Sequence, residues 1–286
     1  KNTFLRCQSF YSKLNRFVEL YDPSCSIERV DKEFIEAFNK YLKREGLNLN
    51  SRYSFVNLLK WFLSWALKEG MLINDDFRKF SLKSLSKGEM DEPPPLYLVW
   101  EELVKIYNSD PGSRRLEHCR DIYCFMAFTG CKLDELQKLG KSDIEKDYII
   151  INGKNSRRIA MNSFSKKITE QYMNKYYRRG DLFPYYTKMT LNKYIRELCV
   201  FLNFEREVKI RRGGKVLISA ISKLITINSA KPTFYANAVK MGLSPGLIQL
   251  WTGNESLSSY KRIKKDIRKQ ENENITIINK YYEDTL

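Results

Sequence analysis

Residues 125–144 have the sequence FMAFTGCKLDELQKLGKSDI, and the interpretation of the fold starts from them. The apolar residues of this region recur at helical spacing, which predicts helices over residues 116–129 and 133–139. The segment that follows, YIIINGKNSRRIAMN (residues 148–162), carries β-branched residues around Asn152-Gly153, which predicts a β-hairpin. This part of the chain is therefore expected to be mainly α-helical with a small hairpin.

Helical patterns continue on both sides of this stretch. A polar segment that ends in three prolines, SLKSLSKGEMDEPPP (residues 81–95), interrupts them and is expected to be a linker, because prolines cannot continue a helix. Further helices are predicted over residues 100–107, 164–177, 191–204, 232–241 and 245–250, and a second turn is predicted at Gly213-Gly214 within residues 208–216.

The residues before the linker form a second helical pattern. One helix is predicted after a cap at Asp31, and another after Asn50-Ser51, with Gly70 as the C-cap of the latter. A chain of 286 residues is long enough for two cores. We therefore expect a helical domain over residues 1–80, a linker over 81–95 and a second domain over 96–286.

The composition favours a polyanionic partner. Fifty Lys and Arg residues stand against 34 Asp and Glu residues, and 43% of the residues are hydrophobic, so the chain is basic and still able to fold. Basic side chains bind nucleic acid of any sequence by neutralising phosphates and releasing counterions. Charge alone favours such a partner but is also compatible with a basic protein that has none.

Several classes of site are excluded by the residue types. The six cysteines form no C-x-x-C pair and lie in or beside apolar runs, as free thiols do in a reducing compartment. His118 is the only histidine, so a site that needs two imidazoles cannot form. We expect no metal, no cofactor, no membrane span and a cytoplasmic location.

Four segments carry a resemblance to a known family. They are residues 125–144, the hairpin with Lys154 at its turn, SAKPTFYANAVKMG (residues 229–242) and IQLWTGNESLSSYKRI (residues 248–263). Their order and spacing resemble those of the tyrosine recombinases, or phage-type integrases, and the first domain resembles that family's SAM-like core-binding domain. The resemblance spans nearly the whole chain and is closest to integrases of mobile elements.

The resemblance implies a protein that clamps double-stranded DNA between two domains. In this family a tyrosine attacks the scissile phosphate, two arginines hold its oxygens, a hairpin lysine protonates the leaving oxygen, and histidines or a tryptophan assist. Planar guanidinium groups suit this reaction because they hold the charged phosphate oxygens in a bidentate manner.

Most of these positions are substituted here. Lys132 takes the place of the first arginine and Lys231 that of the second, while Asn228 and Asn254 take the places of the two histidines. Lysine keeps the positive charge of arginine but lacks its planar, bidentate guanidinium group. Asparagine cannot exchange a proton near neutral pH. Lys154 matches the hairpin lysine, although a solvated turn lysine is an equal interpretation.

The nucleophile is the least certain of the positions implied by the resemblance. An ungapped count from Asn254 reaches Ile263, which cannot attack phosphorus. Tyr260 lies one helical turn earlier and would enter the site only through a three-residue deletion; packing is the favoured role for it. Tyr281 or Tyr282 could also be supplied from elsewhere.

Three hypotheses follow. The favoured one is a recombinase-like DNA-binding protein that is catalytically impaired and acts as an accessory or regulatory factor, because the lost residues all serve one reaction. The second is an active recombinase with a lysine-based site and Tyr260 as nucleophile. The third is a protein-interaction module that no longer binds DNA.

Other basic and polar residues are candidates for DNA contact, although each could be a solvated face. The tail over residues 272–286 is expected to be available for a homo-oligomer on DNA, as in relatives. The candidates for contact with DNA are Ser51, Arg52, Tyr53, Arg157, Arg158, Arg211, Arg212, Lys261 and Arg262.

Overall fold

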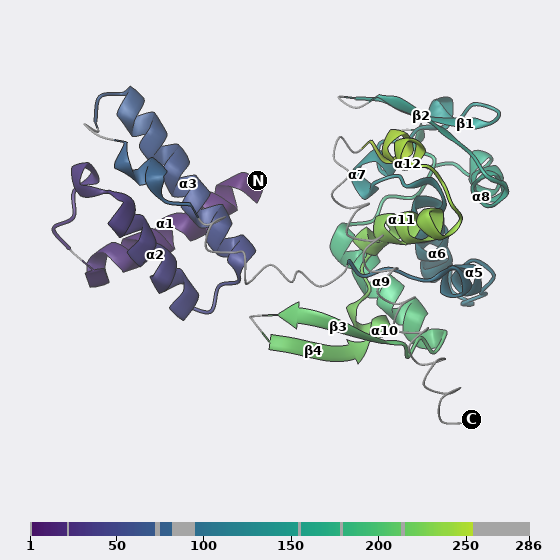
Figure 1. Cartoon of the computed structure of the whole chain (residues 1–286). Helices are drawn as coiled ribbons and strands as arrows, with labels where there is room; N and C mark the ends of the chain where they lie inside the picture. Colours follow the sequence, from purple (N-terminus) through teal and green to yellow (C-terminus); the bar gives the residue numbers. More distant parts are fainter. Residues whose placement is uncertain are drawn as a thin grey trace, which may run out of the picture. The chain divides into compact units, whose positions relative to one another are not determined.

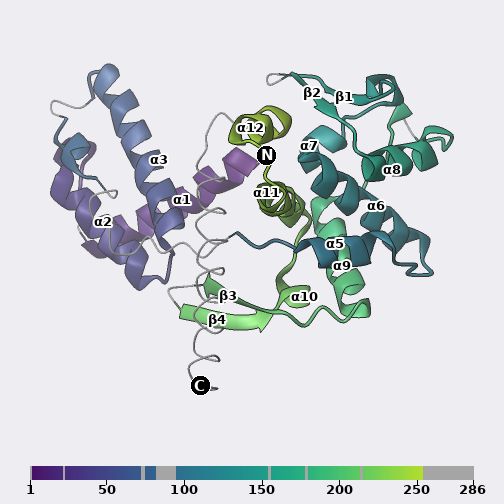
Figure 2. The same cartoon turned by 45° about the vertical axis from the view of Figure 1, so that its right-hand side comes forward.

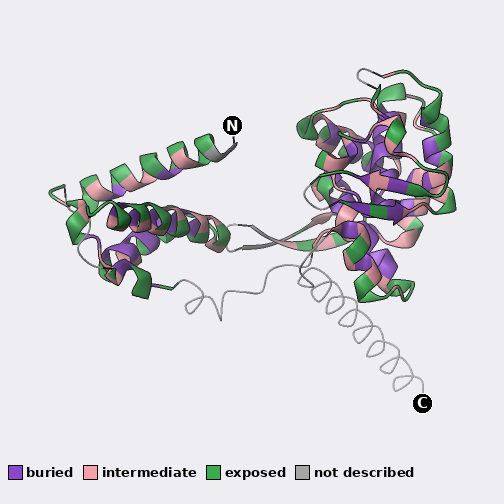
Figure 3. Ribbon diagram, turned by 90° about the horizontal axis from the view of Figure 1, so that it is seen from above, coloured by how far each residue is buried: buried purple, intermediate pink, exposed green. Residues whose placement is uncertain are grey.

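The computed structural model describes residues 2–21, 23–71, 75–81, 95–153, 156–177, 180–212 and 215–253. The chain divides into two compact units, residues 1–93 with 211–217, and residues 94–210 with 218–286. Each unit has its own buried core (Figure 3). None of the helices in the described ranges is long and apolar enough to cross a membrane.

The first unit is helical. Its elements are α1 (Asn2–Tyr21), η1 (Ile27–Arg29), α2 (Lys32–Arg44), α3 (Leu49–Lys68) and η2 (Asp76–Lys79) (Figure 1). Phe17 packs its ring against Phe34 and Phe38, with centroids 5.3 Å from each, and so joins α1 to α2. An aromatic core of this kind gains stability from buried area and from edge-to-face geometry.

The ends of α2 and α3 are set by capping side chains. Asp31 accepts a hydrogen bond of 2.8 Å from the Phe34 N–H, which confirms the predicted start of α2. The cap of α3 is Asn48, which accepts from the Ser51 N–H at 2.8 Å, so the expected start after Asn50-Ser51 was about one half turn late. Gly70 follows α3 with a φ of 75°, as expected for a helix C-cap.

The second unit is built around α6 (Arg114–Thr129), which packs against α5 (Trp100–Tyr107), α8 (Ser163–Met173), α9 (Lys188–Phe201) and α11 (Ala230–Lys240). Most residues of α6 are buried, including the polar His118 and Asp121, so neighbouring elements enclose this helix on most sides. Short elements complete the unit: α7 (Leu133–Leu136), η4 (Lys141–Asp143), α10 (Ile221–Leu224), η6 (Ile227–Ser229) and α12 (Pro245–Thr252).

Two antiparallel hairpins belong to the second half of the chain. β1 (Tyr148–Ile151) pairs with β2 (Arg157–Ala160) in the register Ile149 to Ile159, which confirms the first predicted hairpin. β3 (Glu207–Arg212) and β4 (Lys215–Ala220) flank the second predicted turn, whose two glycines lie outside the described residues. The β1–β2 hairpin lies at the same end of the second unit as α7 and α12 (Figure 2).

The predicted helices are present, with shifted boundaries. The helix expected over residues 164–177 ends at Met173 because Asn174 is its C-cap, and the one expected over 133–139 ends at Leu136. All six cysteines are free thiols, as expected. His118 is buried and its Nδ1 lies 2.9 Å from the Tyr186 hydroxyl, in line with a structural role. The mainly helical fold class is therefore confirmed.

Candidate nucleic-acid interface

The corner between α6 and α7 places Lys132. α6 ends at Gly130, whose φ is 73°, and a Cβ there would lie 2.8 Å from Thr252 Cγ2 and 2.9 Å from Phe234 Cδ1. Glycine is therefore required at position 130 for two reasons: the backbone is left-handed there, and the space for a side chain is filled. Lys132 is the N-cap of α7, and its backbone N–H donates to Glu135 Oε2 at 2.8 Å.

Glu135 and Arg157 form a buried bidentate ion pair. Arg157 Nη1 donates to Oε1 at 2.9 Å and Nη2 donates to Oε2 at 2.8 Å. The Arg157 side chain is 4% exposed and the Glu135 side chain 15%. Burial by itself would raise the pKa of Glu135, but hydrogen bonds from Arg157 and from the Lys132 backbone outweigh it and lower that pKa. The carboxylate is therefore held in its charged form.

Lys231 enters the same cluster from α11. Its Nζ donates to the Thr252 carbonyl at 3.0 Å. Burial, together with the nearby charge of Lys132, lowers the pKa of Lys231 to about 8. Glu135 acts in the opposite direction. Lys132 and Arg157 thus pair with one carboxylate and Lys231 lies nearby, so these four side chains carry an excess of positive charge.

The last turn of α12 is bound to this cluster. Helices end with carbonyl groups that lack an intrahelical partner, and cations stabilise that end of the helix. Arg157 Nε donates to the Trp251 carbonyl at 2.8 Å, while Lys231 binds the carbonyl of Thr252. Gly253 then turns the chain with a φ of 58°, and a Cβ there would lie 2.8 Å from Arg157 Nη1.

The structure brings together the two lysines that were expected at the arginine positions of the family. Asn228 is exposed in η6, just ahead of α11, so it lies three residues before Lys231 without being buried in the cluster. The remaining positions expected in this site, Lys154, Asn254, Tyr260 and Ile263, lie outside the described residues.

Two of the arginines expected to contact DNA are buried. Arg157 was expected to extend from the hairpin, and instead it points inward, because it shares a strand face with the buried Ile159. Arg52 is 5% exposed, and its Nη1 donates to Asn39 Oδ1 at 3.1 Å inside the first unit. For both residues the expectation of a solvent-facing phosphate contact is corrected.

The other candidates lie on α3, β2 and β3 or outside the described residues. Ser51 lies in the first turn of α3, and Tyr53 is 37% exposed and lines a groove with Arg6, Asn57 and Trp61. Arg158 is exposed on β2 and pairs with Glu145. Arg211 and Arg212 lie on β3, whereas Lys261 and Arg262 lie beyond the described residues.

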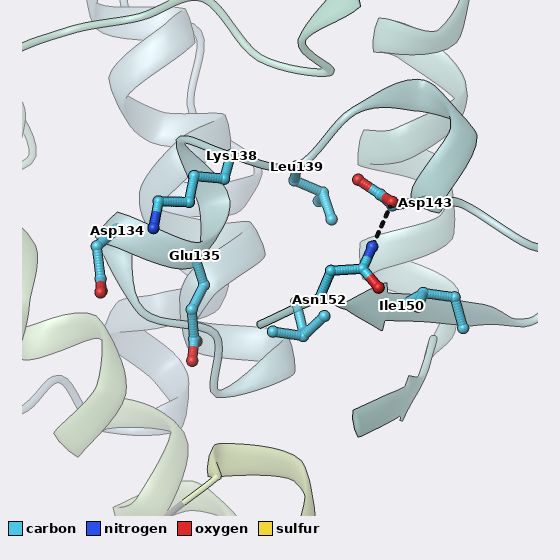
Figure 4. Close-up of a pocket in the computed structure, with 8 residues that line it drawn as sticks. Asp134, Glu135, Lys138, Leu139, Asp143, Ile150 and Asn152 are labelled. Atoms are coloured by element: carbon cyan, nitrogen blue, oxygen red, sulfur yellow. Dashed lines mark hydrogen bonds between the residues drawn. The ribbon is translucent and has the colours of Figure 1, made fainter. Parts of the chain in front are cut away.

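A small pocket on another side of α7 has the opposite character. Asp134, Glu135 and Asp143 contribute carboxylates to its lining, against one ammonium from Lys138, and Asn152 donates to Asp143 Oδ1 at 2.8 Å (Figure 4). With three carboxylates and one ammonium, this lining does not favour a phosphate. The described residues contain no group of three or more His, Cys, Asp or Glu side chains arranged to hold a metal ion.

Sequence reasoning missed the roles of Arg157 and Gly253. The signal for Arg157 was present in strand alternation, because residues 149, 151, 157 and 159 follow one period-2 face. No comparable signal exists for Gly253, since its contact with Arg157 joins segments 96 positions apart in the chain, from 157 to 253.

Comparisons with known proteins agree with this architecture. Residues 1–82 match the family model described as the phage integrase SAM-like domain. The chain is 18% identical to the Tn1549 transposon integrase in complex with circular intermediate DNA, with a TM-score of 0.66 over 88% of this chain and 87% of that one. Comparison with curated protein sequences finds no match.

Two further solved structures have the same fold. The XerH site-specific recombinase bound to palindromic difH substrate is 19% identical, with a TM-score of 0.70 over 95% of this chain and 79% of that one. A lambda integrase (residues 75–356) dimer bound to a COC′ core site is 16% identical, with a TM-score of 0.60 over 90% of each chain.

Proposed function

Since the chain has the tyrosine recombinase fold and begins with a phage integrase SAM-like domain, we propose that it binds double-stranded DNA and is impaired in strand cleavage. It would act as an accessory or regulatory factor in recombination or in integration of a mobile element. The observation that carries the proposal is a chain of contacts at one site: Lys132 and Arg157 pair with Glu135, and Arg157 and Lys231 bind the adjacent carbonyls of Trp251 and Thr252.

The charge of this site supports binding. The Lys132 side chain is 36% exposed, and its Nζ lies 3.9 Å from Glu135 Oε1, beyond hydrogen-bond distance. An ammonium group in that position can contact a phosphate oxygen. The Tn1549 integrase, XerH and lambda integrase structures were each determined with DNA, which supports DNA as the partner of this chain also.

The chemistry of the site supports impaired cleavage. Lysine in place of arginine offers a point charge where the family uses a planar fork, and a developing phosphorane charge is then held less rigidly. The one histidine of the chain is buried beside Tyr186 and Tyr172, within a different cluster. The arginine in the site, Arg157, has its guanidinium bound to Glu135.

Two measurements test the proposal with the full chain. Fluorescence anisotropy on a labelled duplex should show an affinity that falls steeply as salt rises, because each phosphate contact releases counterions. Incubation with a nicked suicide substrate should then yield no covalent protein–DNA adduct. Affinity that does not change with salt would favour the protein-interaction module instead.

A second candidate is an active recombinase with a lysine-based site. It is favoured by the proximity of Lys132 and Lys231, which that mechanism requires together with Lys154 and Tyr260. An adduct on the suicide substrate that disappears in Tyr260→Phe would establish this function and exclude the first. An adduct that persists in that variant would point to Tyr281 or Tyr282.

The proposed partner set also includes a second copy of the chain. A homo-oligomer on DNA through residues 272–286, and a cytoplasmic location, complete the proposal. Sedimentation of the chain with and without duplex, compared with a variant lacking residues 272–286, tests the oligomer. An unchanged oligomeric state in the shortened chain would exclude the tail as its basis.

A further inference from the structure

Arg157 has binding partners from two separate elements. Its two terminal nitrogens bind both oxygens of Glu135 on α7, and its Nε binds the carbonyl of Trp251 at the end of α12. Gly253 packs against the guanidinium, because a Cβ added to this glycine would lie 2.8 Å from Arg157 Nη1. With 4% of its side chain exposed, Arg157 is held inside the unit.

The pairing of Arg157 with Glu135 determines which partners the Lys132 ammonium can bind. Glu135 Oε1 accepts from Arg157 Nη1 at 2.9 Å, and Oε2 accepts from Arg157 Nη2 and from the Lys132 N–H at 2.8 Å each. The ammonium of Lys132 pairs with Oε1 only at 3.9 Å, longer than a hydrogen bond, so this ion pair is loose. A bidentate arginine therefore satisfies a carboxylate that would otherwise attract the neighbouring lysine.

Arg157 also fixes the surroundings of Lys231. The carbonyls of Trp251 and Thr252 are adjacent, and the first accepts from Arg157 while the second accepts from Lys231. Thr252 is fully buried, and its hydroxyl lies 2.9 Å from the Tyr235 hydroxyl. The position of the Lys231 ammonium therefore depends on a helix end that Arg157 holds in place.

We propose that Arg157 is a positioning residue for the phosphate-binding lysines: it neutralises Glu135 and anchors α12, and so leaves Lys132 and Lys231 directed at a DNA phosphate. This inference rests on the proposed function and adds to it the residue that positions the two lysines. Arg157 itself makes no phosphate contact in this scheme. A direct contact would require the guanidinium to leave Glu135 and would expose a buried carboxylate without its partner.

The two roles predict different outcomes for paired substitutions. In Arg157→Met, the charge of Glu135 attracts Lys132 away from the DNA. The plot of the logarithm of the DNA association constant against log salt should then become shallower by about one unit, since each phosphate contact contributes roughly 0.9. Affinity should fall about tenfold at low salt. Adding Glu135→Gln removes that competing charge, so the double variant should recover the wild-type slope and most of the affinity.

The double variant also addresses folding. Removing one member of a buried ion pair leaves an uncompensated charge, whereas removing both is often close to neutral, so the double variant is expected to fold even if Arg157→Met does not. Circular dichroism before each titration identifies folded samples. Lys167→Met, at an exposed position on α8, serves as the control for the loss of one positive charge elsewhere on the unit.

The outcomes separate the inference from the proposed function. A double variant whose salt dependence stays about one phosphate contact weaker than wild type shows that competition by Glu135 for Lys132 is not what Arg157 prevents, and this overturns the inference. A folded Arg157→Met that keeps the wild-type slope overturns it also. If the wild-type chain shows no salt-dependent affinity for a duplex, the proposed function itself fails, whatever the variants do.

Discussion

Two adjacent arginines on β2 have opposite environments. Arg157 is buried, bidentate to Glu135 and bound to the end of α12, while Arg158 is exposed, pairs with Glu145 at 2.7 Å and lies 4.3 Å above the ring of Tyr148. The same residue type therefore has two roles within one step of the chain. Strand alternation decides between them, because successive side chains point to opposite faces of the hairpin.

One of the two largest effects should follow from removing the buried arginine. Arg157→Met is expected to lower the free energy of unfolding by about 1.5–3 kcal/mol, because the partly buried Glu135 loses two charge-assisted hydrogen bonds that Lys132 replaces only in part. The loss should appear as a shift in the denaturant midpoint of the unfolding curve. If Arg157→Met and Arg158→Met cost the same, the contrast between the two faces of β2 is wrong.

The second, of similar size, concerns the glycine that covers the guanidinium. Gly253→Ala should cost about 2–3 kcal/mol, from the left-handed backbone and from displacement of a hydrogen-bonded guanidinium. Gly112 is a matched control, since its φ is 60° against 58° for Gly253 and nothing lies within 4 Å of its added Cβ. Gly112→Ala should therefore cost only about 1 kcal/mol. Equal losses in thermal unfolding would show that Arg157 is not close-packed.

A smaller effect is expected from pH, through Lys231. Its pKa of about 8 means that the ammonium loses its proton as pH rises from 7 to 9, so DNA affinity should fall about threefold over this range. In Lys231→Arg the affinity should stay level, because arginine does not titrate there. Anisotropy titrations at constant salt measure both. A wild-type profile as flat as that of the arginine variant would contradict a phosphate contact by Lys231.

The same lysine predicts the sign of a stability change. The unfolded chain binds this proton more tightly than the folded chain, whose pKa is lowered. The unfavourable contribution of Lys231 is therefore fully present below pH 8 and is relieved as pH rises from about 8 towards 10.5. Lys231→Met should remove this part of the pH dependence.

The smallest effect should follow from breaking the exposed pair. Arg158→Met and Glu145→Gln are each expected to change the free energy of unfolding by about 0–1 kcal/mol, since surface ion pairs are screened and mobile. Chemical unfolding at low and high salt measures the change. A loss in either variant that rivals that of Arg157→Met would mean that exposure on β2 does not govern the strength of these pairs.

The sequence was sufficient where local chemistry decides the structure. The cap at Asp31, the hairpin around Asn152-Gly153 and the mainly helical class were all predicted from spacing and turn residues, and all are present. The start of α3 was misplaced because two asparagines, Asn48 and Asn50, are both good caps, and only the fold shows that Asn48 accepts the Ser51 N–H.

The site could be predicted only in part. Lys132 and Lys231 were found through a family resemblance, and the structure places them in one electrostatic cluster. The pairing of Glu135 with Arg157 spans 22 positions and two elements, so neither composition nor periodicity could reveal it. Arg157 was assigned to the surface because basic residues usually are exposed, and the burial of a paired arginine is the exception to that rule.

Hydrogen bonds from a lysine hold residues 78–80 of the first unit against α3. Lys60, midway along α3, donates to the carbonyls of Arg78 and Phe80 at 3.2 and 2.5 Å, and burial lowers the pKa of its ammonium. Phe77 and Phe80 are buried in the core just beyond. Residues 78–80 are thus tied to α3, one of the two 20-residue helices of this unit, and the buried core that they complete is formed by residues between Phe10 and Phe80.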